Sequence, residues 1–117
     1  MNFIKCQVES YKPLKIVCNN ITLSPESKGK PQGDSVIIGI RPEDISVSNM
    51  RTEDSIEIVV SVIEPAGSFN WVDFMWNEVK MKGTGKAEEE LKPGDKAFIN
   101  FSADKVIAFD YITSRRL

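Results

Sequence analysis

The sequence contains no histidine among its 117 residues. Serine–histidine and cysteine–histidine nucleophile pairs are therefore excluded. The carboxylates that lie next to one another are Glu88-Glu89-Glu90 and Glu43-Asp44. A run of glutamates is typical of a solvated surface, because an acid/base pair needs opposed side chains with separated pKa values. We therefore expect no catalytic residues in this chain.

Cysteine is scarce, since Cys6 and Cys18 are the only two and they do not form a C-x-x-C pair. Two thiols cannot hold a metal cluster unaided, so a metal site would depend on carboxylates and these two scattered cysteines. Each cysteine lies among the apolar residues of a predicted strand, which is typical of a buried free thiol. We therefore expect two free, buried cysteines, no metal site and no cofactor.

Long apolar runs and excess positive charge are also missing. No stretch approaches the length of a transmembrane helix, and no signal-peptide pattern opens the sequence. Lys and Arg total 15 against 17 Asp and Glu, a net charge of -2, which argues against a broad nucleic-acid surface. The length and the 41% hydrophobic content fit one soluble domain that can bury a core.

Short apolar stretches with a period of two run through the chain. They predict strands at residues 3–10, 14–18, 21–23, 36–40, 45–47, 55–63, 69–76, 79–82, 97–101 and 106–111. Turn residues predict turns at 19–20, 65–67 and 93–95, a surface loop at 24–35 and a hairpin loop at 103–105. No pattern supports a helix longer than one turn, so the fold is predicted to be all-β, as a small barrel or a sandwich.

For two of these strands the sequence predicts further detail: the face that points inward in one, and the turn that ends the other. The strand at 55–63 is the most regular, and its inward face would carry Ile56, Ile58, Val60 and Val62. The run from Val36 to Ile40 ends at a turn in which Pro42 would begin a short helical segment, with acidic residues in its first turn. Gly39, inside the apolar run, marks a close backbone approach.

Residues 69–76 are apolar on both faces. One face carries Val72, Phe74 and Trp76, and the other carries Phe69, Trp71 and Met75 together with Asp73. If the first set fills the interior, the second forms an outward apolar face that binds another protein or is covered by a loop. The opposite assignment, with Phe69 and Trp71 inside and Trp76 outside, stays open, because Asp73 and Asn70 argue in opposite directions.

Gly83-Thr84-Gly85-Lys86 has a superficial likeness to a phosphate-binding loop. That motif needs a glycine where Lys80 stands and a serine or threonine where Ala87 stands. No helical pattern follows the segment, so the helix N-terminus that such a loop uses is missing as well. We reject it as a nucleotide site.

Five segments, in the right order, resemble the C-terminal region of the ATP-binding subunits of maltose-type sugar importers, which are ABC transporters. They are Met1-Asn2-Phe3-Ile4, Gly39-Ile40-Arg41-Pro42-Glu43, Val62-Ile63-Glu64-Pro65-Ala66-Gly67-Ser68, Leu91-Lys92-Pro93-Gly94-Asp95, and Phe109-Asp110 through Arg115-Arg116-Leu117. The last resembles F-D-x-x-T-G-x-R-L, with Ser114 in place of the glycine. This region is the transport-associated OB (TOBE) domain, and the resemblance spans nearly the whole chain.

The resemblance implies an OB-like barrel domain over residues 1–117, in which the joint residues Gly39, Arg41, Pro42 and Glu43 connect two sub-lobes. Terminal strands would pair with internal ones. It also implies a non-catalytic accessory or regulatory domain, and the G-x-x-x-x-G-K-[ST] motif of the ATPase domain is absent. The partners it implies are an ABC ATPase domain, a second copy in a homodimeric subunit and a cytoplasmic regulator. The location implied is the cytoplasm, with the membrane reached only through the transporter.

Two other functions stay open. Related domains of molybdate transporters and storage proteins bind oxyanions, but the S-A-R-N-type segment they use is not found here. An OB surface for single-stranded nucleic acid would stack bases on Phe69, Trp71 and Tyr111 and would need a basic groove around them. Asp73 and Glu64 lie close by in sequence and argue against that use, so no nucleic-acid partner is expected.

Overall fold

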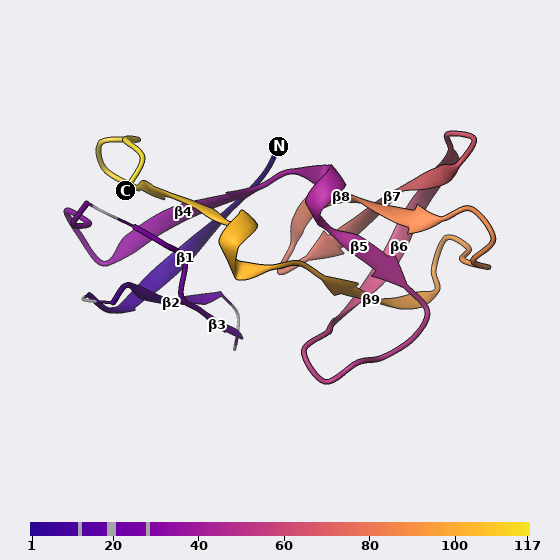
Figure 1. Cartoon of the computed structure of the whole chain (residues 1–117), viewed down its shortest axis with the longest axis horizontal. Helices are drawn as coiled ribbons and strands as arrows, with labels where there is room; N and C mark the ends of the chain where they lie inside the picture. Colours follow the sequence, from indigo (N-terminus) through magenta and orange to yellow (C-terminus); the bar gives the residue numbers. More distant parts are fainter. Residues whose placement is uncertain (12, 19–20, 28) are drawn as a thin grey trace. The chain divides into compact units, whose positions relative to one another are not determined.

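The computed structural model describes residues 1–11, 13–18, 21–27 and 29–117. These residues form ten strands and two 3₁₀ helices, arranged in two compact units (Figure 1). Unit 1 consists of Met1–Ile40 and Ser102–Leu117, and unit 2 of Arg41–Phe101. Neither described helix exceeds three residues, so the all-β prediction is confirmed. The turn predicted at Asn19-Asn20 lies outside the described residues.

Unit 1 is built on a five-stranded sheet in the order β10-β4-β1-β2-β3. The strands are β1 (Asn2–Ser10), β2 (Lys15–Cys18), β3 (Ile21–Leu23), β4 (Ser35–Ile40) and β10 (Ile107–Asp110). β4 runs antiparallel between β1 and β10, with Ile38 opposite Ile4 on one side and Ala108 on the other. All three residues are buried, so strands from both chain ends contribute to one core, as the resemblance implied.

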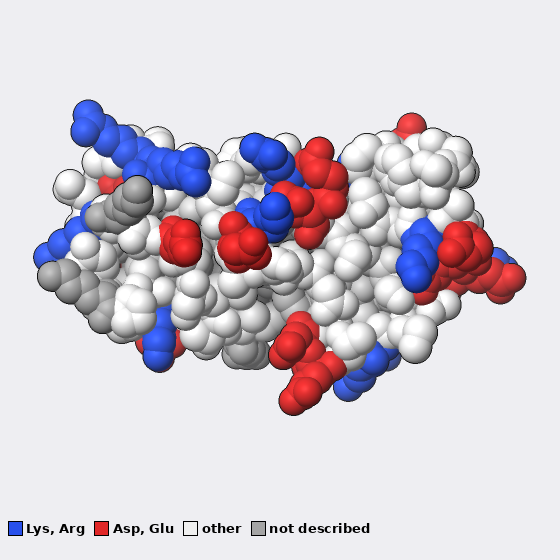
Figure 2. All heavy atoms as spheres, viewed as in Figure 1, with Lys and Arg blue, Asp and Glu red and all other residues white. Residues whose placement is uncertain are grey.

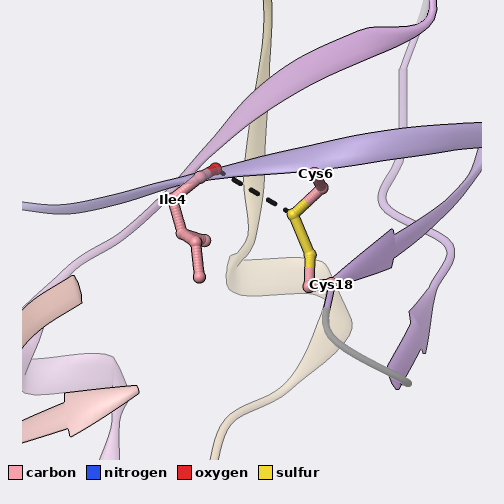
Figure 3. Close-up of a disulfide and its surroundings, with 3 residues drawn as sticks. All are labelled: Ile4, Cys6 and Cys18. Atoms are coloured by element: carbon pink, nitrogen blue, oxygen red, sulfur yellow. Dashed lines mark hydrogen bonds between the residues drawn. A yellow bond between two sulfur atoms is a disulfide. The ribbon is translucent and has the colours of Figure 1, made fainter. Parts of the chain in front are cut away.

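Cys6 on β1 and Cys18 on β2 form a disulfide (Figure 3), so the expectation of free thiols was wrong. The register of β1 and β2 places Gln7 opposite Val17. Continued by one residue, it brings Cys6 and Cys18 face to face, with their Cα atoms 4.9 Å apart. Both are buried, as predicted. The Cys6 sulfur lies 3.9 Å from the Ile4 carbonyl oxygen, a packing contact because a disulfide sulfur carries no hydrogen.

Unit 2 is a closed five-stranded barrel in the order β5-β8-β7-β6-β9. The strands are β5 (Ser46–Ser48), β6 (Ile56–Pro65), β7 (Phe69–Trp76), β8 (Val79–Lys86) and β9 (Lys96–Asn100). β7 and β8 are joined by Asn77 and Glu78, whose φ angles of 51° and 64° are those of a type I′ hairpin turn. Alternate residues of the strands fill the interior, among them the buried Ile58, Phe74 and Ile99.

Val62 departs from the predicted alternation of β6. Val60 lies opposite Phe74 but Val62 lies opposite Asp73, so one extra residue interrupts the ladder on the β6 side. Such a bulge turns the residues that follow it to the other face of the strand. Val62 is therefore 50% exposed instead of lining the core.

The last two strands do not form the predicted hairpin. β9 pairs with β5 and β6 in unit 2, whereas β10 pairs with β4 in unit 1. Between them lies the 3₁₀ helix η2 (Ala103–Lys105). The prediction was wrong because a short gap between two alternating strands does not reveal which sheet each one joins. The short helix predicted at Pro42 is confirmed as η1 (Pro42–Asp44), with Glu43 and Asp44 in its first turn.

Candidate functional site

The two apolar faces of β7 differ in burial. The interior face consists of Val72, Phe74 and Trp76, none more than 3% exposed. On the outer face Phe69 and Trp71 are half-buried and Met75 is 44% exposed. β7 lies between β6 and β8 in the closed barrel, and a closed barrel has only one interior. The structure therefore decides which face of β7 points inward, a question that the sequence left open.

The outer apolar face of β7 continues onto β6. Val59 lies opposite Met75 and is 48% exposed, and Val62 is turned outward by the bulge. We call this set the barrel stripe; it consists of Val59, Val62, Phe69, Trp71 and Met75. Phe69 and Trp71 pack edge to face with ring centroids 5.0 Å apart. Large apolar side chains grouped on an outer face are typical of a protein-binding surface.

Lysines on β8 border the barrel stripe. The cross-strand pairs are Met75 with Lys80, Asp73 with Lys82, and Phe69 with Lys86. Asp73 and Lys82 form an ion pair of 3.5 Å, and the Lys82 amino group lies 5.8 Å from the centroid of the Trp71 ring. The sequence analysis predicted the alternation of residues 79–82 but missed this proximity, because the pattern of one strand does not reveal its register with the next.

A surface groove of about 750 Å³ adjoins Phe69 and Trp71, which form part of its wall. Its charged side chains are one lysine and three glutamates: Lys86, Glu43, Glu88 and Glu89. The Glu89 carboxylate accepts hydrogen bonds from the Ser48 hydroxyl at 2.9 Å and the Asn49 backbone N–H at 2.7 Å, so it holds the end of β5. The groove extends the aromatic end of the barrel stripe toward Glu43.

The predicted joint residues span the end of β4 and η1: Gly39, Arg41, Pro42 and Glu43. Gly39 is buried, and a Cβ atom there would lie 2.7 Å from Met1 Sδ and 3.2 Å from Phe3 Cε1. Glycine at this position therefore leaves room for those two side chains. Arg41 is exposed and extended, as expected of a residue before proline. Backbone geometry and close packing account for this motif.

A second groove, of about 740 Å³, lies in unit 1 and was not identified from the sequence. Leu14 forms part of its apolar lining, Ser24 and Ser27 contribute hydroxyl groups, and Arg116 contributes a guanidinium. Glu26 is the acidic side chain in the described lining. Arginine and hydroxyl groups are the usual ligands of an oxyanion, since they donate hydrogen bonds to it.

The C-terminal segment that resembles F-D-x-x-T-G-x-R-L forms a tight turn around Asp110, which is 2% exposed. Its carboxylate accepts hydrogen bonds from the Gln32 N–H at 3.0 Å, the Thr113 N–H at 3.0 Å and the Thr113 hydroxyl at 2.8 Å. These hydrogen bonds, the one from Gln32 foremost, lower the pKa of Asp110, although burial acts in the opposite direction. Asp110 and Thr113 thus have a structural role in the motif.

Neither a metal centre nor a phosphate loop emerges from the described residues. No three of their histidine, cysteine, aspartate or glutamate side chains are grouped so as to hold a metal ion. Gly83 to Lys86 belong to β8, where the Thr84 N–H donates to the Ile45 carbonyl at 2.9 Å. The backbone of this segment forms hydrogen bonds to neighbouring strands and does not curl into an anion-binding loop. The described helices are far below the length needed to cross a membrane.

Residues 1–45 match the sequence model of the MalK OB fold domain family. This stretch contains β1 to β4 and the joint residues. The resemblance to a transport-associated OB domain is thereby confirmed for this part of the chain. Comparison with curated proteins finds no match.

Among solved structures, 44 chains match. One is the cytoplasmic molybdate-binding protein ModG, crystallised with molybdate bound, which aligns with a TM-score of 0.68 at 16% identity. The alignment covers 92% of this chain and 94% of the ModG chain. At this level of identity the likeness establishes the fold alone, and it confirms an OB-like fold over nearly the whole chain.

Proposed function

We propose that this chain, a transport-associated OB-type domain whose first 45 residues match the MalK OB fold domain, is a non-catalytic accessory domain of an ABC import ATPase. Its work is to bind other proteins: the ATPase domain, a second copy of the subunit, or a cytoplasmic regulator. It would act in the cytoplasm and meet the membrane only through the transporter.

The observation that carries this proposal is the barrel stripe. Val59, Val62 and Met75 are between 44% and 50% exposed, and they lie next to the half-buried Phe69 and Trp71. Aromatic residues and methionine are enriched where proteins bind one another, and tryptophan is frequent among residues that dominate the binding energy. A surface of this kind suits a domain whose function is contact with another protein.

Calorimetric titration tests the proposal directly. The ligand is the ATP-binding subunit of a maltose-type importer from which the C-terminal domain has been removed. We expect saturable binding with a dissociation constant at or below about 10 μM, a value within the range of specific protein complexes. Absence of heat at subunit concentrations of about 100 μM, with the chain monomeric, would rule out the ATPase domain and a second copy as partners.

Oxyanion binding is the second candidate function. The groove in unit 1, with Arg116 and two serine hydroxyls, supports it, as does the fold shared with a molybdate-binding protein. Titration with molybdate and with sulfate is the test. We expect Arg116→Gln to abolish any binding that occurs in this groove, because the planar guanidinium is its strongest oxyanion donor. Binding that survives this substitution would exclude the groove as the site.

A further inference from the structure

We propose that the barrel stripe recognises a protein segment that carries apolar side chains flanked by carboxylates. This inference deepens the proposed function and rests on it for the premise that the barrel face binds protein. What it adds is the chemistry of the partner, which follows from charged residues that the strand register places beside the apolar ones.

A row of four side chains crosses the outer face of the barrel. In order across β8, β7, β6 and β9 they are Lys80, Met75, Val59 and Lys96, each opposite the next in the strand register. Neighbouring strands lie about 5 Å apart, so the two lysines are separated by about three strand spacings along the curved wall of the closed barrel. The row therefore has an apolar centre and a positive charge at each end.

The two end lysines are available to a partner. Both are exposed, and neither forms an ion pair with any described residue. The nearest carboxylates in the register are Asp73 beside Lys80 and Glu57 beside Lys96, and each is already paired, Asp73 with Lys82 at 3.5 Å and Glu57 with Arg51 at 3.3 Å. A bound segment could therefore pair its own carboxylates with Lys80 and Lys96 without displacing an existing ion pair.

Charge complementarity selects an acidic partner over a basic one. The chain as a whole has a net charge of -2, so the positive ends of this row are a local feature and not a consequence of overall composition. Charges at the edge of an interface, such as those of Lys80 and Lys96, guide association and fix the register of a partner. The apolar centre provides the surface that becomes buried against the partner. Lys86 lies outside the proposed site, because it shares its groove with Glu43, Glu88 and Glu89.

The same face is poorly suited to single-stranded nucleic acid. Base stacking needs open aromatic faces, whereas the exposed centre consists of Val59, Val62 and Met75. The Trp71 ring already has Lys82 near its face and Phe69 against its edge. Acidic side chains also lie on this outer face, with Asp73 paired to Lys82 and Glu57 paired to Arg51. On the side of the molecule drawn in Figure 2, acidic and basic side chains likewise lie in small groups. A protein segment fits these features better than a polyanion does.

Fluorescence anisotropy with short labelled peptides tests the inference. A peptide of alternating leucine and glutamate is the probe, and an alternating leucine–lysine peptide and oligothymidylate are the comparisons. We expect the leucine–glutamate peptide to bind at least about tenfold more tightly than either comparison. Its affinity should fall as salt is raised, because exposed ion pairs are screened. Tighter binding of the leucine–lysine peptide or of the oligonucleotide would overturn the inference.

Charge reversal locates the site. We expect Lys80→Glu with Lys96→Glu to weaken binding of the leucine–glutamate peptide by about tenfold or more. The matched control is Lys30→Glu with Lys105→Glu, which changes the net charge equally at two exposed lysines of unit 1 and should alter binding by less than about twofold. Equal effects of the two double variants would overturn the site, since overall charge would then explain the binding.

The apolar centre has its own variant, Val59→Ser with Met75→Ser. We expect it to weaken peptide binding by about tenfold while leaving the salt dependence unchanged, and a variant that binds like the unmodified chain would contradict the site. These titrations use the chain alone, so their result does not depend on an ABC ATPase. Peptide binding with no binding of the ATP-binding subunit would rule out the ATPase domain as the partner in the proposed function and leave the surface assignment standing.

Discussion

Ser114 has a φ of 62°, in the left-handed region that side chains other than glycine and asparagine rarely occupy. Ser114 stands where the family pattern that this segment resembles has glycine. The positive φ at this position explains why glycine suits it. A residue with a Cβ atom in this conformation is strained by about 1–2 kcal/mol, partly offset because glycine has more freedom in the unfolded chain.

We therefore predict that Ser114→Gly stabilises the protein by about 0.5–1 kcal/mol, measured from urea unfolding curves. Ser102→Gly is the matched control, because Ser102 has a φ of -85° and gains nothing from glycine. The control should destabilise the protein slightly through unfolded-state entropy. Equal shifts in the same direction for both variants would show that strain at Ser114 is not the cause.

Asp110 should make stability depend on pH in the acid range. Its pKa in the folded protein lies below its ordinary value of 3.8, so the unfolded chain binds a proton first as the pH falls. The stabilising contribution is therefore complete above that value and is lost as the pH falls through the folded pKa. We predict that Asp110→Asn has a lower free energy of unfolding than the unmodified protein near neutral pH and loses less of it on acidification. Urea unfolding curves measured between about pH 6 and about pH 3 provide the test. A steeper acid loss in the variant would contradict this role.

At the scale of elements, the disulfide between β1 and β2 closes a short loop, with 12 residues of sequence separation. Closing a loop of that length stabilises a protein by about 2–4 kcal/mol, chiefly by restricting the unfolded chain. Disulfides are rare in cytosolic proteins, so in the proposed compartment unit 1 must also fold with both thiols reduced.

We predict that a reducing agent lowers the free energy of unfolding by about 2–4 kcal/mol without unfolding the protein at 25 °C. Urea curves with and without dithiothreitol provide the measurement. Cys6→Ala with Cys18→Ala should be insensitive to the reagent. A wild-type curve that dithiothreitol does not move would mean that this bond does not stabilise the fold.

Local signals explain which elements could be predicted from the sequence. The strands follow from period two, and η1 follows from Pro42 with acidic residues after it. What could not be predicted depends on register between distant strands. The disulfide needs the pairing of β1 with β2, the exposure of Val62 needs a bulge against β7, and the sheet membership of β10 needs its pairing with β4.

The candidate site divides in the same way. The grouping of Phe69, Trp71 and Met75 on one face of a strand is visible in the sequence. Their outward orientation requires barrel closure, and the neighbours Val59 and Lys80 require the register of β7 with β6 and β8. A single strand's pattern therefore identifies the aromatic part of a surface but not the residues that complete it.

At the scale of the whole molecule, we predict that the chain neither binds nor hydrolyses ATP. Gly83 to Lys86 lie within a barrel strand, and the sequence lacks the glycine and the serine or threonine of a phosphate loop. Titration with ATP should give no saturable signal at micromolar concentrations. Saturable binding that Lys86→Ala removes would refute the assignment of this segment to a purely structural role.

The central claim is that the barrel stripe is a protein-binding surface and not part of the core. It is tested most directly by sedimentation velocity of Phe69→Ser with Trp71→Ser, mixed with the ATP-binding subunit. We predict that this double variant keeps its native circular dichroism spectrum and no longer co-sediments with the subunit. The inner-face pair Val72→Ser with Phe74→Ser should unfold, because both of those side chains are fully buried. If the outer-face variant unfolds like the inner-face pair, or stays folded and co-sediments as the wild type does, the barrel stripe is not the interface.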